Sequence, residues 1–93
     1  MREIRQTATF KRDLKREAKG QHREFLSRHF THLIGKIAND EPLAAQVRDH
    51  PPVGEWKDFR DCHLRPDLVL IYRKPDDTTL QLVRLGSHAE LSL

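Results

Sequence analysis

The sequence predicts an α+β fold in which two N-terminal helices pack on a small antiparallel sheet, in the order β-α-α-β-β-β. Apolar residues recur at helical spacing in the first part of the chain, whereas short strand-like runs separated by turn residues fill the last part. A chain of 93 residues has room for one hydrophobic core. We therefore expect residues 1–93 to form a single domain.

The first segment, residues 2–8, is short and partly β-branched, which predicts a strand. Thr9 is the expected N-cap of a helix that Gly20 ends. The apolar residues of this helix share one face, at Phe10, Leu14 and Ala18. Its basic residues lie between them, at Lys11, Arg12, Lys15, Arg16 and Lys19. The pattern predicts a short amphipathic helix with a basic outer face.

A second, longer helix is predicted for residues 22–39. Its apolar stripe has a helical period and consists of Phe25, Leu26, Phe30, Leu33, Ile34 and Ile37. Asn39-Asp40 and Pro42 are expected to end it. The histidines of this helix lie outside any motif, and we interpret them as surface or helix-packing residues: His22, His29 and His32. A connector rich in proline follows over residues 41–55.

Three strands are predicted after the connector, over residues 56–64, 68–73 and 78–85. Turn residues separate them at Arg65-Pro66-Asp67 and at Lys74-Pro75-Asp76-Asp77, so we expect an antiparallel meander. The run 68–72 is apolar at every position, which predicts a central strand covered by the helices on one side. Gly86-Ser87-His88 is expected to break the last strand before a short tail.

The net charge of +3 is unevenly distributed along the chain. Residues 1–30 hold nine basic and four acidic side chains, a balance of +5, whereas the remaining residues have a balance of −2. A basic N-terminal part is typical of proteins that bind a polyanion, such as RNA, DNA or an acidic protein. It is also typical of a well-solvated helix face, so charge alone indicates a class of partner and does not identify one.

Composition also bears on the compartment. The chain has no run of about 18 apolar residues, the length needed to span a bilayer. Its first residues lack the apolar segment of a secretory signal. The single cysteine, Cys62, excludes a disulfide within the chain and agrees with a reducing compartment. We expect a cytoplasmic protein that does not bind membranes.

The predicted meander carries polar side chains that suit chemistry better than packing. Alternation along residues 56–64 places an aspartate and a histidine on the same face, which is unusual for a buried sheet. That face holds Lys57, Phe59, Asp61 and His63. Asp67 follows in the next turn, where a tight turn folds it back toward the end of the sheet. The sequence therefore predicts a polar cluster at this end.

Two further histidines flank the meander. His50 precedes its first strand and His88 follows its last, so both would lie near His63 if the strands pair in sequence order. Histidine titrates near neutral pH and serves as a general base or acid. RNA cleavage by the substrate's own 2′-OH needs a base, an acid and a cation that offsets charge on the phosphorane. Two histidines, a carboxylate and an arginine would meet this requirement without metal or cofactor.

Each residue of the cluster also has an ordinary structural explanation when taken singly. His63 would be a half-buried strand residue, Asp67 a turn residue and Arg84 a surface charge. A zinc site is not favoured, because the chain has no HxxxH, HxH or CxxC spacing. The residues alone therefore leave the cluster open to both interpretations.

The same residues carry a resemblance to a known family. Five segments match in order and spacing: Asp49-His50-Pro51, Gly54-Glu55-Trp56-Lys57, Arg60-Asp61-Cys62-His63, Pro66-Asp67-Leu68-Val69-Leu70-Ile71-Tyr72 and Arg84-Leu85-Gly86-Ser87-His88. Together they resemble the YafQ branch of the RelE toxin superfamily over residues 42–91. The N-terminal segment Thr7-Ala8-Thr9-Phe10-Lys11-Arg12-Asp13 is similar to the family more loosely.

The resemblance implies a toxin of a type II toxin–antitoxin pair, with a fold related to microbial ribonucleases. Such toxins enter the ribosomal A site and cleave mRNA there. A RelB/DinJ-like antitoxin is the implied partner, and operator DNA would be contacted only through the antitoxin complex. The basic helices would then contact ribosomal RNA.

The resemblance also implies roles for individual residues. The implied catalytic set is His50, His63, Asp67 and His88, with Asp61 supporting it. Asp67 or His50 would be the general base and His88 the general acid. The residues implied to hold phosphates are Lys57, Arg60 and Arg84. We expect neither a metal nor a cofactor.

The tail departs from the family pattern His-x-x-Leu-Phe, because Ser92 stands where an aromatic ring would stack on a base. Base stacking and codon preference are therefore not carried over, whereas the acid–base set is. Three other functions stay open. They are a catalytically inactive module that binds antitoxin or operator, a ribonuclease that acts without ribosomes, and a metalloprotein.

Overall fold

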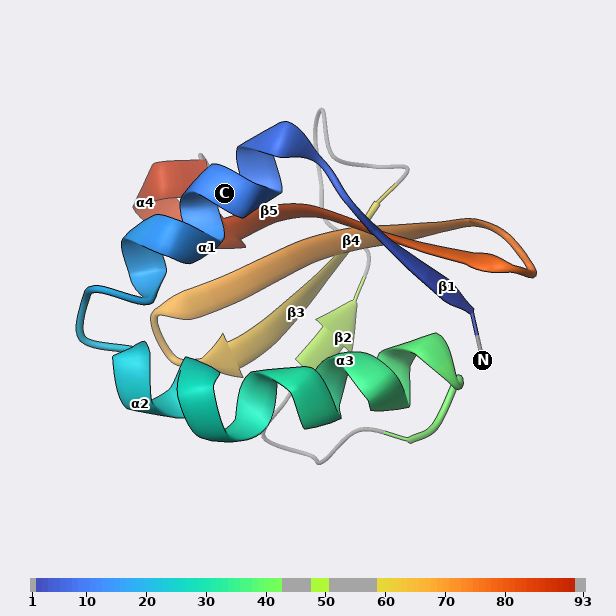
Figure 1. The fold of residues 1–93 in the computed structure, drawn as a ribbon, viewed down its shortest axis with the longest axis horizontal. Helices are drawn as coiled ribbons and strands as arrows, with labels where there is room; N and C mark the ends of the chain where they lie inside the picture. Colours follow the sequence, from blue (N-terminus) through green and yellow to red (C-terminus); the bar gives the residue numbers. More distant parts are fainter. Residues whose placement is uncertain (1, 43–47, 51–58, 92–93) are drawn as a thin grey trace.

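The computed structural model describes residues 2–42, 48–50 and 59–91, with residues 48–50 described by their backbone alone. In chain order the elements are β1 (Glu3–Gln6), α1 (Ala8–Glu17), α2 (Arg23–Phe25), the π-helical turn η1 (Leu26–Phe30), α3 (Thr31–Ala38), β2 (Arg48–His50), β3 (Arg60–Arg65), β4 (Leu68–Asp76), β5 (Thr79–Gly86) and α4 (His88–Leu91). The strands form one five-stranded sheet in the order β1-β5-β4-β3-β2. Figure 1 shows α1 across the top of the view and α3 across the bottom, both on the same face of the sheet, with α4 beside the end of β5.

The predicted α+β class is confirmed, and so is the antiparallel meander of β3, β4 and β5. The prediction of a purely antiparallel sheet was wrong, because β1 runs parallel to β5, with Glu3 opposite Thr79. Strand β2 was also missed, since it lies within the segment predicted as a connector. A three-residue strand of charged residues has too little apolar alternation to be recognised in a sequence.

Helix α1 begins two residues before the predicted position. Its N-cap is Thr7 and not Thr9, because the Thr7 hydroxyl accepts a hydrogen bond from the backbone N–H of Phe10 at 3.0 Å. The same hydroxyl donates to the carbonyl of Val83 at 2.9 Å. One side chain thus caps the helix and joins its first turn to β5.

The predicted second helix is confirmed as a continuous run of α2, η1 and α3, although the π-helical turn was not foreseen. Its apolar stripe is buried as predicted, at Leu26, Phe30, Ile34 and Ile37, with Phe25 and Leu33 partly buried. Asp40 adopts the left-handed region with φ of 57°, directly after the C-cap Asn39. The two helices meet where the rings of Phe10 and Phe30 stack, with centroids 6.2 Å apart.

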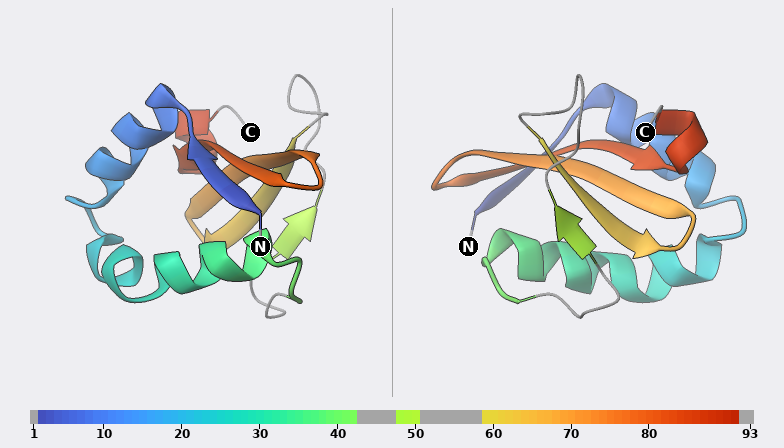
Figure 2. Two further views of the ribbon diagram at one scale, coloured as in Figure 1. Left: turned by 45° about the vertical axis from the view of Figure 1, so that its right-hand side comes forward. Right: turned by 180° about the vertical axis from the view of Figure 1, so that it is seen from behind.

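The hydrophobic core lies between the helices and one face of the sheet, and β4 contributes to both faces. Leu68, Leu70 and Tyr72 pack with the helices, whereas Val69 and Ile71 form a smaller cluster on the opposite face. Leu91 of α4 covers this smaller cluster, with Phe59 and Val83 at its edge. The two-sided burial confirms β4 as the central strand. The right view of Figure 2, from behind, shows α4 at the end of β5.

The turn between β4 and β5 is tighter than predicted, because β4 continues to Asp76 and β5 begins at Thr79. The carboxylate of Asp76 accepts hydrogen bonds from the backbone N–H and the hydroxyl of Thr78, both at 2.9 Å. Pro75, which has no N–H to donate, falls where the ladder between Arg73 and Asp76 is irregular. Within the described ranges, no helix is both long and apolar enough to cross a membrane.

Candidate active site

His63 and His88 are in contact, although they come from different elements. Their imidazole rings meet edge to face, with centroids 4.9 Å apart. His63 lies on β3 and His88 is the first residue of α4. The predicted approach of the last loop to the strand of His63 is therefore confirmed. Two imidazoles in one place can supply a proton acceptor and a proton donor together.

Strand alternation explains which side of the sheet the pair occupies. Cys62 and Leu64 point into the core under the helices, so Asp61 and His63 face the opposite side, as predicted. Asp61 is nevertheless buried, with 4% of its surface exposed. A buried carboxylate two positions from His63 suits a supporting role more than direct contact with a large substrate.

His88 owes its position to a capping box at the start of α4. The backbone N–H of Ser87 donates to Glu90 Oε1 at 2.8 Å, and the backbone N–H of Glu90 donates to Ser87 Oγ at 3.1 Å. The Ser87 N–H bond is the main reason that the pKa of Glu90 lies below its ordinary value. The sequence pattern Ser-x-x-Glu announces such a cap, and reading it would have predicted α4.

Asp67 is exposed in the turn between β3 and β4 and lines a cavity of about 360 Å³. Ser87 and Glu90 of the α4 cap line the same cavity, together with Arg16 at the end of α1. Asp67, at the first turn of the meander, and Ser87, directly before His88, therefore line the same cavity. Neither His63 nor His88 lines this cavity, so the convergence of Asp67 with the histidine pair stays a prediction.

For the remaining predicted site residues, the structure gives a backbone or register position, or nothing. The backbone of His50 pairs with that of Asp61, since β2 lies antiparallel to β3. Lys57 and Ser92 lie outside the described residues. Arg60 is opposite Tyr72, whose side chain packs under the helices, so its register position belongs to the face opposite that of His63. The register therefore places Arg60 on the face away from the histidine pair.

Arg84 is held by a carboxylate that the sequence did not single out. Its Nε donates to Asp13 Oδ2 at 2.7 Å and its Nη2 donates to Asp13 Oδ1 at 3.4 Å. This side-on arrangement uses one edge of the guanidinium, and the other edge carries further N–H donors. Arg84 lies opposite Ile71, on the same face of the sheet as His63. The ion pair with Asp13 thus fixes the Arg84 cation at the edge of that face.

Asp13 is almost fully buried and also accepts hydrogen bonds from Arg16 Nη1 at 3.1 Å and from the backbone N–H of Leu85 at 3.0 Å. Burial raises the pKa of this carboxyl, but the hydrogen bonds from Arg84 and Leu85 and the charges of both arginines outweigh it. The pKa of Asp13 therefore lies below its ordinary value. Asp13 thus joins α1 to the end of β5.

Arg16 extends this network to α4. Its Nη2 donates to the carbonyl of Leu85 at 3.0 Å, and its Nε lies 2.9 Å from Glu17 Oε2 and 3.2 Å from Glu90 Oε2. All three guanidinium nitrogens are thus engaged, since Nη1 bonds Asp13. Arg16 is exposed, as the amphipathic pattern predicted, but its guanidinium is also bound by these protein partners. No local pattern reveals these contacts, because the partners on β5 and α4 lie far along the chain.

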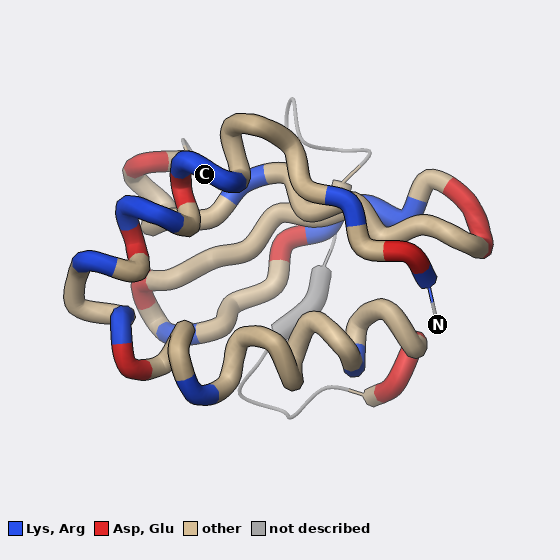
Figure 3. The backbone as a smooth tube through the Cα atoms, in the orientation of Figure 1, with Lys and Arg blue, Asp and Glu red and all other residues tan. Residues whose placement is uncertain are grey.

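The other cations of α1 do form an outward-facing basic surface. Lys11, Arg12, Lys15 and Lys19 are exposed, as the amphipathic pattern predicted. Figure 3 shows Lys and Arg gathered along α1 and into the connection toward α2. This surface adjoins the end of the sheet where β5 meets α4.

Comparison with known proteins matches the chain along nearly all its length. The family described as bacterial toxin of type II toxin-antitoxin system, YafQ, matches residues 2–93. The mRNA interferase toxin YafQ of Escherichia coli strain K12 is 49% identical over 55 residues, and the chain spans 59% of that relative's length. The mRNA interferase toxin YafQ of E. coli strain B / BL21-DE3 is 37% identical over 90 residues, which cover 97% of this chain and 95% of that protein.

Solved structures support the same relationship. A copper-bound mutant toxin from Helicobacter pylori has a TM-score of 0.84 and 34% identity, covering 98% of this chain and 99% of its own. A chain of the E. coli DinJ-YafQ complex has a TM-score of 0.78 and 36% identity, with 98% of both chains covered. The family match and these structures agree with the resemblance read from the motifs. The chain belongs to the YafQ family of bacterial toxins of type II toxin–antitoxin systems.

Proposed function

We propose that this chain, acting as a single toxin domain, is an endoribonuclease that cleaves mRNA in the ribosomal A site. The observation that carries the proposal is the edge-to-face contact of His63 and His88, with rings 4.9 Å apart. The names of its E. coli relatives, mRNA interferase toxins, support the choice of substrate. The Asp67 cavity beside the α4 cap supports a site open to a strand of RNA.

The reaction is an internal transesterification of RNA. A general base, Asp67 or His50, removes the proton of the 2′-OH, and the resulting oxygen attacks the adjacent phosphorus. His88 donates a proton to the departing 5′ oxygen, which leaves as a 5′-OH, while the other fragment ends in a 2′,3′-cyclic phosphate. Contact with the ring of His63 holds the ring of His88 in one orientation. Asp61 supports His63 from the same strand.

A cation must offset the negative charge that builds on the phosphorane. Arg84 suits this role because Asp13 holds it side-on and leaves its outer N–H groups directed away from the carboxylate. Lys57 and Arg60 stay predicted phosphate contacts from the family resemblance. Of the three, Arg84 is the one whose orientation the described contacts fix.

A similar toxin from H. pylori was solved with copper bound, which raises the question of a metal site in this chain. The described part of the chain contains no group of three or more His, Cys, Asp or Glu placed to hold a metal ion. His63 and His88 supply two imidazoles, fewer than the three protein ligands typical of catalytic zinc. No metal-ligand set is complete among the described residues, so the reaction we propose uses protein side chains alone.

We predict that chelation leaves the activity unchanged. Cleavage by protein treated with EDTA and dialysed should proceed at the untreated rate, because the proton transfers use side chains alone. Magnesium has to be restored in ribosome-dependent assays, so the comparison adds Mg²⁺ back to both samples. Activity that is lost on chelation and returns only with copper or zinc would contradict the acid–base mechanism.

The antitoxin and the ribosome are the proposed partners. A DinJ-YafQ complex among the similar structures supports a DinJ-like or RelB-like antitoxin for this chain, with operator DNA bound only through that complex. The exposed cations of α1 are suited to ribosomal RNA. We expect action in the cytoplasm, where both partners are found.

Expression without an antitoxin tests the proposal. The wild-type chain should arrest growth and translation, and His88→Ala should relieve the arrest at equal protein level. His32→Ala, an exposed histidine of α3, is the matched control and should stay toxic. Cleavage ends mapped on cellular mRNA should fall within codons in reading frame. A folded, well-expressed wild-type chain that is harmless would favour the catalytically inactive binding module.

An assay with purified ribosomes distinguishes the proposed enzyme from a ribonuclease that acts without ribosomes. A ribosome-dependent enzyme cleaves mRNA only in the presence of ribosomes, whereas a general ribonuclease cleaves free RNA equally well. We expect the first result, because a free strand lacks the ribosomal contacts that the basic surface of α1 would make.

A further inference from the structure

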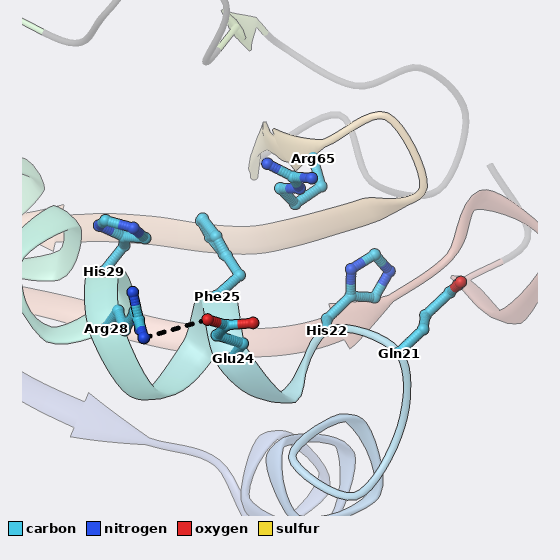
Figure 4. Close-up of a pocket in the computed structure, with 7 residues that line it drawn as sticks. All are labelled: Gln21, His22, Glu24, Phe25, Arg28, His29 and Arg65. Atoms are coloured by element: carbon cyan, nitrogen blue, oxygen red, sulfur yellow. Dashed lines mark ion pairs between the residues drawn. The ribbon is translucent and has the colours of Figure 1, made fainter.

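A second polar cavity lies between the N-terminal turns of the long helix and the end of β3 (Figure 4). Its volume is about 270 Å³, and neither His63 nor His88 lines it. Its lining includes the cations Arg28 and Arg65, the rings of Phe25 and His29, Gln21 and the carboxylate of Glu24. Nothing in the proposed reaction uses this cavity.

Planar groups dominate one wall. The guanidinium of Arg65 lies over the ring of Phe25, 5.7 Å from its centroid, and the rings of Phe25 and His29 have centroids 5.6 Å apart. Figure 4 shows Arg65 reaching over the cavity from β3 while Phe25 and His29 rise from the helix. A guanidinium attracted to an aromatic ring keeps a rim of N–H donors for an anion.

A second cation stands at the rim. Arg28 pairs with Glu24 at 3.2 Å, and the two side chains are 69% and 75% exposed. An ion pair this exposed contributes little energy, so an incoming phosphate can take over the arginine at small cost. Arg28 and His29 both lie in the π-helical turn η1, a local geometry that recurs at functional sites.

The cavity is connected to the candidate active site through one residue. Gln21 lines both this cavity and the one that holds Asp67 and the α4 cap. A strand of RNA that reaches Asp67 can therefore continue past Gln21 around the end of the sheet.

We propose that this cavity binds one nucleotide of single-stranded RNA, with its phosphate on Arg28 and Arg65 and its unpaired base against the planar side chains of Phe25, His29 and Arg65. These planar side chains favour RNA over an acidic peptide, because a peptide carboxylate would use the cations alone. The nucleotide comes either from the cleaved strand or from ribosomal RNA. The first source deepens the proposed function, whereas binding itself does not require cleavage.

Binding of labelled RNA to the full chain carrying His88→Ala tests the proposal without cleavage. Fluorescence anisotropy at fixed salt measures Kd for Arg65→Gln, Arg28→Gln and Phe25→Leu, each added to that background. Each should weaken binding by about tenfold, the effect of one charge-assisted hydrogen bond or one stacking contact. Arg23→Gln removes an equal charge from an exposed residue of α2 that does not line the cavity. This control should weaken binding by about twofold at most.

Two RNA samples identify the source. With a short oligonucleotide that spans a cleavage site, the losses indicate the cleaved strand. If the substitutions weaken binding to ribosomes but leave the affinity for the oligonucleotide unchanged, the nucleotide comes from ribosomal RNA. Equal losses for Arg65→Gln, Arg28→Gln and Arg23→Gln, or unchanged RNA affinity with weakened antitoxin binding, would overturn the proposal. RNA that binds through the cavity and is never cleaved by the chain with His88 intact would contradict the proposed function and support this site.

Discussion

Asp13 accepts hydrogen bonds from two arginines and one backbone amide while only 3% of its side chain is exposed. Replacing Asp13 by alanine leaves a void and removes the acceptor of the hydrogen bonds from Arg84 and the Leu85 amide. We expect Asp13→Ala to lower the free energy of unfolding by about 3 kcal/mol, the lower end for a broken buried pair, since both arginines keep some solvent. Urea unfolding measures this. Glu3→Ala, which removes an exposed pair with Arg5, should cost less than about 0.5 kcal/mol.

The lowered pKa of Asp13 also predicts how stability depends on pH. A carboxyl whose pKa is lower in the folded state stabilises the fold above its unfolded pKa of about 3.9, and this contribution is lost as pH falls through the folded value. Wild-type stability should therefore hold from pH 7 to about pH 5 and fall below about pH 4. Asp13→Asn should be less stable at pH 7 and lose less on acidification. Unfolding midpoints at pH 7, 5 and 3 check this, and parallel curves for both proteins would refute it.

At the scale of the element, α4 is a helix of only four residues whose start carries His88. A helix this short depends on its cap, and an N-cap serine replaced by alanine costs about 1 kcal/mol. We expect Ser87→Ala to slow RNA cleavage several-fold, because the cap orients His88, and to lower the free energy of unfolding by no more than about 1 kcal/mol, because most of the core lies outside α4. Cleavage rates and thermal unfolding distinguish the two effects. Ser27→Ala, an exposed serine of η1, should leave both unchanged.

How far sequence reasoning reaches is also clearest at the element scale. Periodicity located α1, the long helix and the meander, because each buries one regular stripe of apolar residues. It missed the pairing of β1 with β5, since a parallel partner far along the chain leaves no local pattern. It also missed the α4 cap, although the pattern from Ser87 to Glu90 was visible.

The candidate site also has a part that the sequence predicted and a part that it did not. Alternation placed Asp61 and His63 on one face, and strand order brought His88 to them. The partners of Asp13 and Arg16 could not be read from α1, where these residues belong to a run of charged positions. Only the tertiary fold distinguishes the charged residue that turns inward from its neighbours that face solvent.

For the whole molecule, the distribution of charge predicts the response to salt. The exposed cations of α1 would release counterions from an RNA phosphate backbone, so ribosome affinity should fall linearly on a logarithmic salt scale. Lys15→Gln should reduce that slope by about one contact. Arg16→Gln should instead lower stability, because its nitrogens bond protein partners. Binding titrations between about 50 and 200 mM salt measure the slope, and a slope of zero would exclude α1 as the docking surface.

The parallel pairing of β1 with β5 has a consequence for how the protein is made. A translating ribosome releases β1 before β5, so β1 cannot pair in the sheet until β5 has emerged. His88 follows β5 directly, and its contact with His63 forms only after that strand has emerged. Long-range pairing of this kind also slows folding. We therefore expect a nascent chain to stay inactive until β5 and His88 have emerged from the ribosome that makes it.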